Sequence, residues 1–276
     1  MIIVNYSSAS EEFKLDVTEI EITQNGNLII GSKGGKAETE DGYEIIAENF
    51  IYNKLNNILK ASGKVTLINK NSSLIISSDK ATYLKNDEIV YTEGNSKAVD
   101  EDSTLIGSNF KFNKIKNILV AEENVKFTDN KKNTIISSDK ATYLKNDEIV
   151  YTEGKTSAII ENQYFFESKN VNYLTNKEQL SSNNKSTIED NDGNTYIVDN
   201  FLYLIKDRLL KAKNLNINAK VDNSKSDNYQ FSDGFFNLST KSFVAGNTNI
   251  KVHKDIFDNN EQDPRIYGVS SHGDEQ

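Results

Sequence analysis

The sequence predicts an all-β protein, an elongated antiparallel sheet folded into a V and built from about seven hairpin repeats of roughly thirty residues. Residues 75–94 and 135–154 both read IISSDKATYLKNDEIVYTEG, without one difference. Residues 108–137, between the copies, have the same pattern in different letters, so the period is near thirty rather than sixty. A fixed period is typical of repeat proteins, in which each unit buries its apolar face against its neighbours.

Each copy of the block predicts its own hairpin. Residues 79–84 and 89–94 have strand-forming composition and flank a polar step at residues 85–88. With a two-residue turn at Asn86 and Asp87, successive side chains alternate between the two faces of the hairpin. One face then carries Ala81, Tyr83, Val90 and Thr92.

The same four positions are largely apolar in the other units, which indicates a fixed register. The opposite face is mixed, with Asn53, Lys60, Lys111, Asn172 and Thr240, so we expect hairpins buried on one side. The quartets are Phe50, Tyr52, Leu59, Ala61; Phe110, Phe112, Leu119, Ala121; Ala141, Tyr143, Val150, Thr152; Val171, Tyr173, Leu180, Ser182; Phe201, Tyr203, Leu210, Ala212; and Gly234, Phe236, Phe243, Ala245.

The elements follow one another from the start of the chain. Residues 13–23 alternate apolar and polar, with a phase slip at Thr18 and Glu19, which predicts a strand pair or a bent strand. Asn25 and Gly26 predict a turn. Residues 201–213 have helical propensity but fall in register with the hairpins, so we expect a hairpin there too. The units span residues 47–77, 78–107, 108–137, 138–167, 168–198, 199–231 and 232 onward.

Every unit has a second half, consisting of a short strand, a polar turn and a closing apolar run. A unit therefore supplies about two passes of the chain, each bent once, so that two arms of a folded sheet face each other. The inner surface of the second arm is expected to carry Val65, Leu67, Val125, Phe127, Leu215, Ile217, Ile250 and Val252.

Composition excludes several classes of protein. The net charge of −9, from 41 acidic and 32 basic residues, argues against binding of nucleic-acid phosphates. The absence of cysteine excludes disulfides, thiolate catalysis and cysteine metal sites in this chain. No run approaches the roughly 20 apolar residues of a membrane helix, and the start lacks a signal-peptide pattern. A hydrophobic content of 36% is low for a sphere but suits a thin stack of repeats.

The sequence contains little that favours catalysis. The two histidines, His253 and His272, have no Ser or Asp partner at a recognisable spacing, so we expect neither an enzyme nor a cofactor. Residues 189–194, EDNDGN, have the composition of a calcium loop. The closing glutamate and the flanking helices of an EF-hand are missing, so we interpret this segment as a turn and expect no metal site.

The residues inside the V have two interpretations. If the arms stay apart they line an apolar groove, whereas if the arms touch they fill a dry core, as in an ordinary β-solenoid. The candidate groove residues are Phe50, Tyr52, Leu59, Tyr83, Val90, Phe110, Phe112, Leu119, Tyr143, Val150, Tyr173, Leu180, Phe201, Tyr203, Leu210, Phe236 and Phe243.

The repeat resembles the OstA-type unit of the lipopolysaccharide-transport family, which includes LptA, LptC and the N-terminal part of LptD. The tail at residues 263–271, DPRIYGVSS, resembles the segment by which LptD leaves its β-jellyroll and enters its outer-membrane barrel. The resemblance implies a periplasmic β-jellyroll (residues 1–254) attached to the outer membrane, whose interior binds the acyl chains of lipopolysaccharide. Residues 255–276 would be a linker to a barrel outside these residues, and a leader is expected outside them as well. The cysteines that tie this domain to the barrel in well-known members are absent here.

The resemblance also implies partners. An LptA-like bridge protein would add a strand at the edge formed by Phe13, Leu15 and Val17. The LptD barrel with its LptE lipoprotein plug would be contacted through Asp263, Pro264 and Arg265. The rival class is a secreted β-solenoid, either an adhesin or a polysaccharide-binding or polysaccharide-processing protein, which predicts parallel rungs around a dry core.

Overall fold

The computed structural model describes residues 13–254 and 264–274. These residues form β-strands joined by short turns, with single 3₁₀ turns at η1 (Gln24–Gly26) and η2 (Lys85–Asp87), so the all-β prediction is confirmed. In the described part of the chain, no helix has the length and apolar character needed to cross a bilayer.

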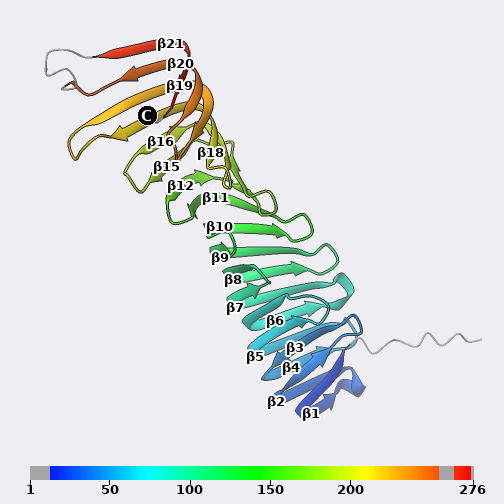
Figure 1. Cartoon of the computed structure of the whole chain (residues 1–276). Coiled ribbons are helices and arrows are strands. Elements are labelled where there is room, and N and C mark those ends of the chain that lie inside the picture. The colour runs from blue at the N-terminus through cyan, green and yellow to red at the C-terminus, as the bar shows by residue number, and fades with distance from the viewer. Residues whose placement is uncertain (1–12, 255–263, 275–276) are drawn as a thin grey trace, which may run out of the picture. The chain divides into compact units, whose positions relative to one another are not determined.

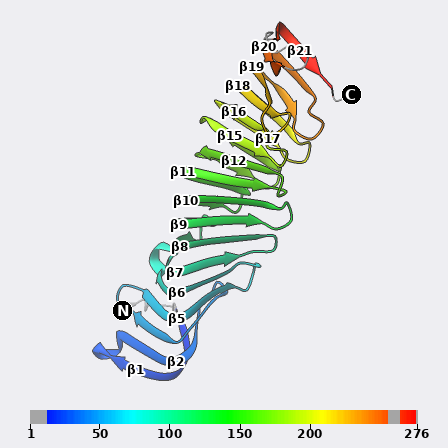
Figure 2. The ribbon, with the colours of Figure 1, turned by 90° about the vertical axis from the view of Figure 1, so that its left-hand side faces the viewer.

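The chain divides into two compact units, Met1–Glu123 and Asn124–Gln276. The unbroken sequence period, by contrast, predicts a single domain. Within each unit the passes of the chain, each made of one bent strand or two short ones, follow one another in chain order (Figures 1 and 2). Unit 1 contains β1 (Lys14–Thr23), β2 (Leu28–Glu38), β3 (Tyr43–Ala47), β4 (Asn49–Asn53), β5 (Ile58–Asn69), β6 (Ile75–Leu84), β7 (Ile89–Val99) and β8 (Ser103–Asn113). Strand β9 (Ile118–Asp129) runs across the division.

Unit 2 begins with two long strands, continues with short ones and ends with four long ones. These are β10 (Thr134–Leu144), β11 (Ile149–Ile160), β12 (Tyr164–Lys169), β13 (Asn172–Leu174), β14 (Gln179–Ser182), β15 (Ser186–Asp190), β16 (Thr195–Val198), β17 (Asn200–Leu204), β18 (Leu209–Lys220), β19 (Ser226–Asn237), β20 (Phe243–Lys251) and β21 (Arg265–Gly273). β17 and β18 form the hairpin expected over residues 201–213.

The described strand pairings are antiparallel, and they have the predicted register. Tyr83 lies opposite Val90 in the first copy of the block, and Tyr143 lies opposite Val150 in the second. The turn of the first copy is centred on Asn86 and Asp87, and the Glu88 amide donates a 3.2 Å hydrogen bond to the Lys85 carbonyl. This pairing is incompatible with the parallel rungs that the rival β-solenoid requires.

Each pass bends once, as predicted, and the bend divides the sheet into two arms. The two halves of β11 pair with separate strands, one with β12 and the other with β13. Long strands show a register shift at the bend, for example between Glu93 and Ser96. Gly94 sits there with a φ of 77°, a conformation that residues with side chains adopt rarely. The bend is visible in β18 to β20 (Figure 1).

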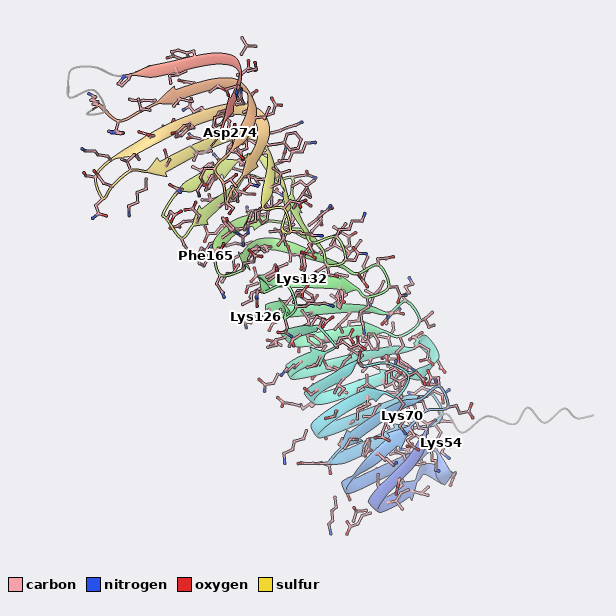
Figure 3. The ribbon with its side chains drawn as sticks, viewed as in Figure 1. Lys54, Lys70, Lys126, Lys132, Phe165 and Asp274 are labelled. Carbon is pink, nitrogen blue, oxygen red and sulfur yellow. The ribbon has the colours of Figure 1, made fainter. Side chains whose placement is uncertain are left out.

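The inner faces of the two arms pack against each other. Of the candidate groove residues, all but Tyr143 and Phe243 are buried, and these two are half-buried. The opposite face projects into solvent, as Phe165 of β12 does with 40% of its surface exposed (Figure 3). Over most of each unit the interior is therefore filled by the chain's own side chains.

The first strand differs in part from its prediction. The phase slip is confirmed as a register shift between Val17 and Glu19, and among the described residues β1 pairs with β2 alone. Phe13, however, precedes β1 and is buried, with its ring 5.0 Å from that of Tyr52 and 5.2 Å from that of Tyr83. Phe13 is thus a core residue, not part of an exposed edge, whereas Leu15 and Val17 lie half-buried on β1.

The tail also differs from its prediction, because the sheet does not end at residue 254. Arg265 to Gly273 form β21, which pairs along its length with β20, from Lys251 opposite Arg265 to Phe243 opposite Gly273. Pro264 lies just before this strand, and its carbonyl accepts a 3.3 Å hydrogen bond from the Val252 amide. Asp263 lies outside the described residues. Ile266, Tyr267 and Val269 are β-branched or aromatic residues that favour a strand, and β20 provides the partner with which the segment pairs.

Candidate functional site

The turns of each unit lie on two rims, one at the outer end of each arm. Rim A consists of turns 54–57, 85–88 and 114–117 in unit 1, and 145–148, 175–178, 205–208 and 238–242 in unit 2. Rim B consists of turns 39–42, 70–74 and 100–102 in unit 1, and 130–133, 161–163, 191–194 and 221–225 in unit 2. Neighbouring turns of one rim share backbone hydrogen bonds, such as Lys114 N to Glu88 O and Lys70 N to Gly42 O, both 3.0 Å.

In unit 1, Lys114 of rim A bridges to rim B. Its ammonium lies 2.8 Å from Asp41 of rim B and 2.5 Å from Glu88 of its own rim, and it also bonds the Tyr83 hydroxyl. Only 3% of the lysine side chain is exposed, and its ammonium sits 4.0 Å from the ring centre of Tyr43. Burial disfavours the charged carboxylates, but the hydrogen bonds and charge of Lys114, together with smaller contributions from neighbouring side chains, outweigh it and hold the pKa of Asp41 and of Glu88 below their usual range.

Among the described residues of unit 2, four ion pairs join the rims, and Lys241 makes two of them. Arg208 of rim A lies 3.0 Å from Glu161 of rim B. Glu178 of rim A pairs with Lys132 of rim B. These two pairs involve half-buried side chains. Lys241 of rim A borders a pocket and makes the other two pairs. It lies 2.7 Å from Asp190, the residue before the rim B turn 191–194, and 3.8 Å from Asp192 within that turn.

Asp190 organises the segment that has calcium-loop composition. Its Oδ1 accepts hydrogen bonds from the amides of Asp192 and Asn194 at 3.1 and 3.0 Å. Its Oδ2 accepts bonds from Asn194 Nδ2 at 2.9 Å, Tyr196 at 3.0 Å and Lys241 at 2.7 Å. The carboxylate is saturated by the protein, so the interpretation as a turn is confirmed. The described residues contain no group of three potential metal ligands.

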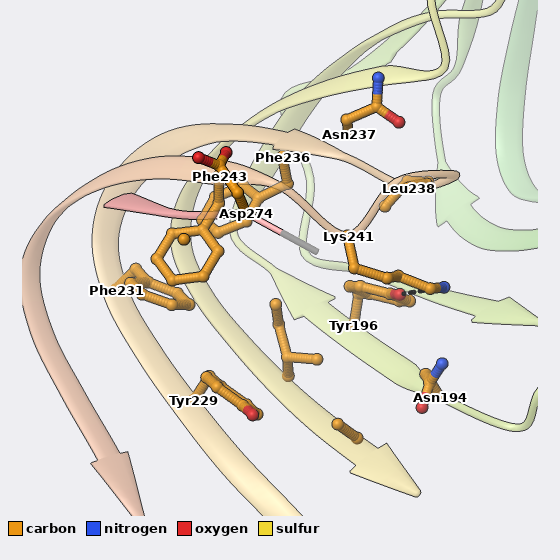
Figure 4. Close-up of a pocket in the computed structure, with 13 residues that line it drawn as sticks. Asn194, Tyr196, Tyr229, Phe231, Phe236, Asn237, Leu238, Lys241, Phe243 and Asp274 are labelled. Carbon is orange, nitrogen blue, oxygen red and sulfur yellow. Dashed lines mark hydrogen bonds between the residues drawn. The ribbon is translucent and has the colours of Figure 1, made fainter. Parts of the chain in front are cut away.

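An apolar pocket of about 380 Å³ opens at the end of unit 2 where β21 lies (Figure 4). Phe231, Phe236 and Phe243 form one wall, with ring centres 5.0 to 5.8 Å apart. Lys241 and Tyr196 stand beside each other at the opposite side. The remaining lining residues are Asn194, Ile217, Ala219, Tyr229, Asn237, Leu238, Gly273 and Asp274.

The pocket exists because the interior lacks side chains to fill it at this end. Gly273 lies directly beneath the Phe243 ring, where a Cβ would be 2.5 Å from the ring edge. Ile217, Tyr229 and Phe243 are consequently half-buried, unlike the equivalent residues earlier in the chain. The pocket is thus the accessible end of the apolar interior.

The structure places the predicted groove residues in two groups. Phe236 and Phe243 line the pocket, together with Ile217 of the predicted second-arm lining. The other candidates form the buried interior, so a lipid-binding role for them stays a prediction. Tyr229 and Phe231 were not predicted, although their alternation with polar residues in the sequence is the signal that would have identified them.

One buried polar atom in the interior has no partner. The Tyr203 hydroxyl is buried and makes no hydrogen bond within the described residues. By contrast, the hydroxyl of Tyr173 donates to Asp129 at 2.8 Å and that of Tyr83 to Glu88. Burial raises the pKa of Tyr203 and Tyr173, so both hydroxyls remain protonated.

The two histidines lie in different surroundings. His253 Nδ1 lies 2.8 Å from Asp227, whose carboxylate also accepts a 2.8 Å bond from the His253 amide, which fixes the chain after β20. His272 lies on β21 opposite Val244, on the exposed face.

Comparison with known proteins gives a limited result. No protein-family model matches the chain, and no curated protein matches it. Among solved structures, the chain is similar to LptH, described as the LptA homologous periplasmic component of the conserved lipopolysaccharide transport device from Pseudomonas aeruginosa. The match is 11% identical, covers 40% of this chain and 81% of that chain, and has a TM-score of 0.37. At this identity and TM-score the similarity supports no conclusion about function, and the fold of this chain is assigned from its own strand pairings.

Proposed function

We propose that the chain binds the acyl chains of a lipid in its apolar interior, and that the lipid is lipopolysaccharide. The observation that carries this proposal is the terminal pocket, where the interior is lined by aromatic side chains but not filled. Its volume lies in the range of small-molecule sites. Each methylene buried there contributes roughly 0.8 kcal/mol to binding.

We infer the identity of the lipid from the resemblance of the repeat to the OstA-type unit. We infer a role in lipopolysaccharide transport in the periplasm, with delivery to an outer-membrane barrel of the LptD kind. An LptA-like protein is the expected partner at β1, because among the described residues one side of this strand has no pairing partner. The chain would act as a carrier without catalysing a reaction.

A dry core, as in a β-solenoid, is the alternative interpretation for the closed part of the interior. It is favoured by the near-complete burial of residues such as Phe112 and Leu180. A closed interior can nevertheless admit a lipid if its arms separate. The two interpretations therefore differ in whether acyl chains reach the inner face.

Photo-crosslinking tests binding in the pocket by comparing the two opposite faces of the same sheet. A photoreactive phenylalanine at Tyr229 lies in the pocket, whereas one at Phe235, a residue that is 47% exposed, lies on the outer face. With purified lipopolysaccharide we expect crosslinking from position 229 and little from position 235. Equal labelling of the two positions, or labelling of neither, would contradict the proposal.

A further inference from the structure

Backbone hydrogen bonds join neighbouring turns within one rim, whereas side chains join one rim to the other. Along each rim of unit 2, turns are joined by backbone hydrogen bonds, such as Thr175 N to Glu148 O and Leu238 N to Arg208 O, both 2.9 Å. Across the rims, the bridges described above are made by side chains. Separating the rims therefore leaves the strand pairing of each arm intact, because it breaks side-chain contacts only.

The bridge beside the pocket joins an exposed lysine to a buried carboxylate that has other partners. Lys241 is 39% exposed, and its ammonium bonds Asp190, with the Tyr196 hydroxyl at 3.4 Å and Asp192 at 3.8 Å. Without Lys241, Asp190 keeps its bonds from the two turn amides, from the Asn194 side chain and from Tyr196. The turn of rim B is thus fixed independently of the bridge, so Lys241 can swing away while rim B stays ordered.

The position of this bridge gives it a consequence for access. Lys241 and Tyr196 form one side of the pocket, and the aromatic wall of Phe231, Phe236 and Phe243 stands at the other (Figure 4). With the bridge open, the pocket is also accessible from the side, between the two rims. The acyl chain of a lipid with a bulky headgroup can then enter from the side while the headgroup stays in solvent, and it does not have to enter from the end of the unit.

We propose that the Lys241–Asp190 bridge is a latch at the side of the pocket in unit 2, and that its opening admits the apolar chain of a lipid from the side, between the rims. This inference rests on the proposed function for its ligand, but the latch itself is a property of the protein alone. Its occupant is an amphiphile whose headgroup remains outside, at the rims. Lys241 is a positioning residue, holding the rims together until the apolar chain enters.

The latch is tested first without a ligand. The chain has no cysteine, so Asn191→Cys on rim B and Thr240→Cys on rim A give two specific spin-label sites. We expect Lys241→Met to lengthen and broaden the distance distribution between the labels. Lys241→Arg retains the charge and should retain the narrow distribution. Lys206→Met, at an exposed position of rim A with no ion pair in the described part of unit 2, is the matched control. A distribution unchanged by Lys241→Met would overturn the proposal.

Sideways entry is tested by locking the rims together. In the Asn191→Cys, Thr240→Cys protein, which keeps Lys241 and Asp190, a bis-maleimide ties the rims, while N-ethylmaleimide modifies the same thiols without tying them. The probe is N-phenyl-1-naphthylamine, an apolar dye that fluoresces when it leaves water. We expect several-fold slower association with the tied protein than with the untied one. Equal rates would mean lengthwise entry and would overturn sideways access. If the dye fails to bind the unmodified chain, the proposed function fails, while the spin-label result still decides the latch.

Discussion

Replacing Lys114 with methionine tests whether the rims of unit 1 are held by the buried bridge. The change keeps the apolar stem and removes the ammonium, so Asp41 and Glu88 lose a shared partner. Removing one member of a fully buried ion pair costs roughly 3–5 kcal/mol. Here the carboxylates are 47% and 21% exposed, so water replaces part of the lost interaction. We therefore expect a loss of about 2–3 kcal/mol in the free energy of unfolding of unit 1.

The assay is urea denaturation of the full chain, followed by tyrosine fluorescence because the chain has no tryptophan. Hydrogen exchange of the turn at residues 39–42 assigns the loss to unit 1, since opening of rim B exposes its amides. The control is Lys54→Met, an exposed position of rim A (Figure 3). For Lys54→Met we expect a change within about 0.5 kcal/mol. If Lys114→Met costs no more than this control, the bridge does not hold the rims and the reasoning is wrong.

Three further predictions concern the same interior. The two carboxyls bonded to Lys114 have lowered pKa values, so their contribution is present above the ordinary carboxyl pKa values of 3.8 and 4.5 and is lost as pH falls below them; the stability difference between wild type and Lys114→Met should shrink in urea titrations at acid pH. Tyr173→Phe should cost about 1–3 kcal/mol by leaving a buried carboxylate short of a donor, whereas Tyr203→Phe should be neutral or stabilising, and equal losses in thermal melts would refute the assignment of partners. Phe13→Ala should cost roughly 3 kcal/mol by removing the ring that closes the interior beside β1, measured by urea denaturation; a loss below about 1 kcal/mol would show that the ring fills no essential space.

Much of the fold is predictable because the same apolar positions recur in every unit, and each recurrence supports the same strand register. A single hairpin register is weak evidence, but a quartet such as Phe50, Tyr52, Leu59 and Ala61 recurring in unit after unit leaves one register compatible with burial. The bend and its glycine follow in the same way from the period. The ends are harder to predict, because an end unit lacks one neighbour and its pattern is tested once only. This is why β21 was taken for a linker and Phe13 for an edge residue.

The candidate site is less predictable than the fold for a physical reason. Bridges across the rims join residues 46 to 73 positions apart, such as Lys132 with Glu178 and Lys114 with Asp41. Which turn of rim A faces a given turn of rim B depends on how far the two ends of each pass are offset along the sheet. The charge pattern of the sequence does not determine this offset. The pocket depends likewise on the small residue Gly273 lying under Phe243, a contact made through the tail.

The repeated block shows that burial of the same side chain depends on residues outside the hairpin. Both copies fold into the same hairpin, yet Tyr83 is fully buried and Tyr143 is half-buried. The difference lies outside the block. The next turn of rim A begins with Lys114 after the first copy and with Thr175 after the second, and each donates its amide to the preceding turn. Lys114 covers the first tyrosine and reaches rim B, whereas the side chain of Thr175 bonds the carbonyl of Glu148 on its own rim. Identical strands thus give unequal burial of the repeated tyrosine, because Tyr83 is covered by side chains from outside the block, Phe13 and Lys114 among them.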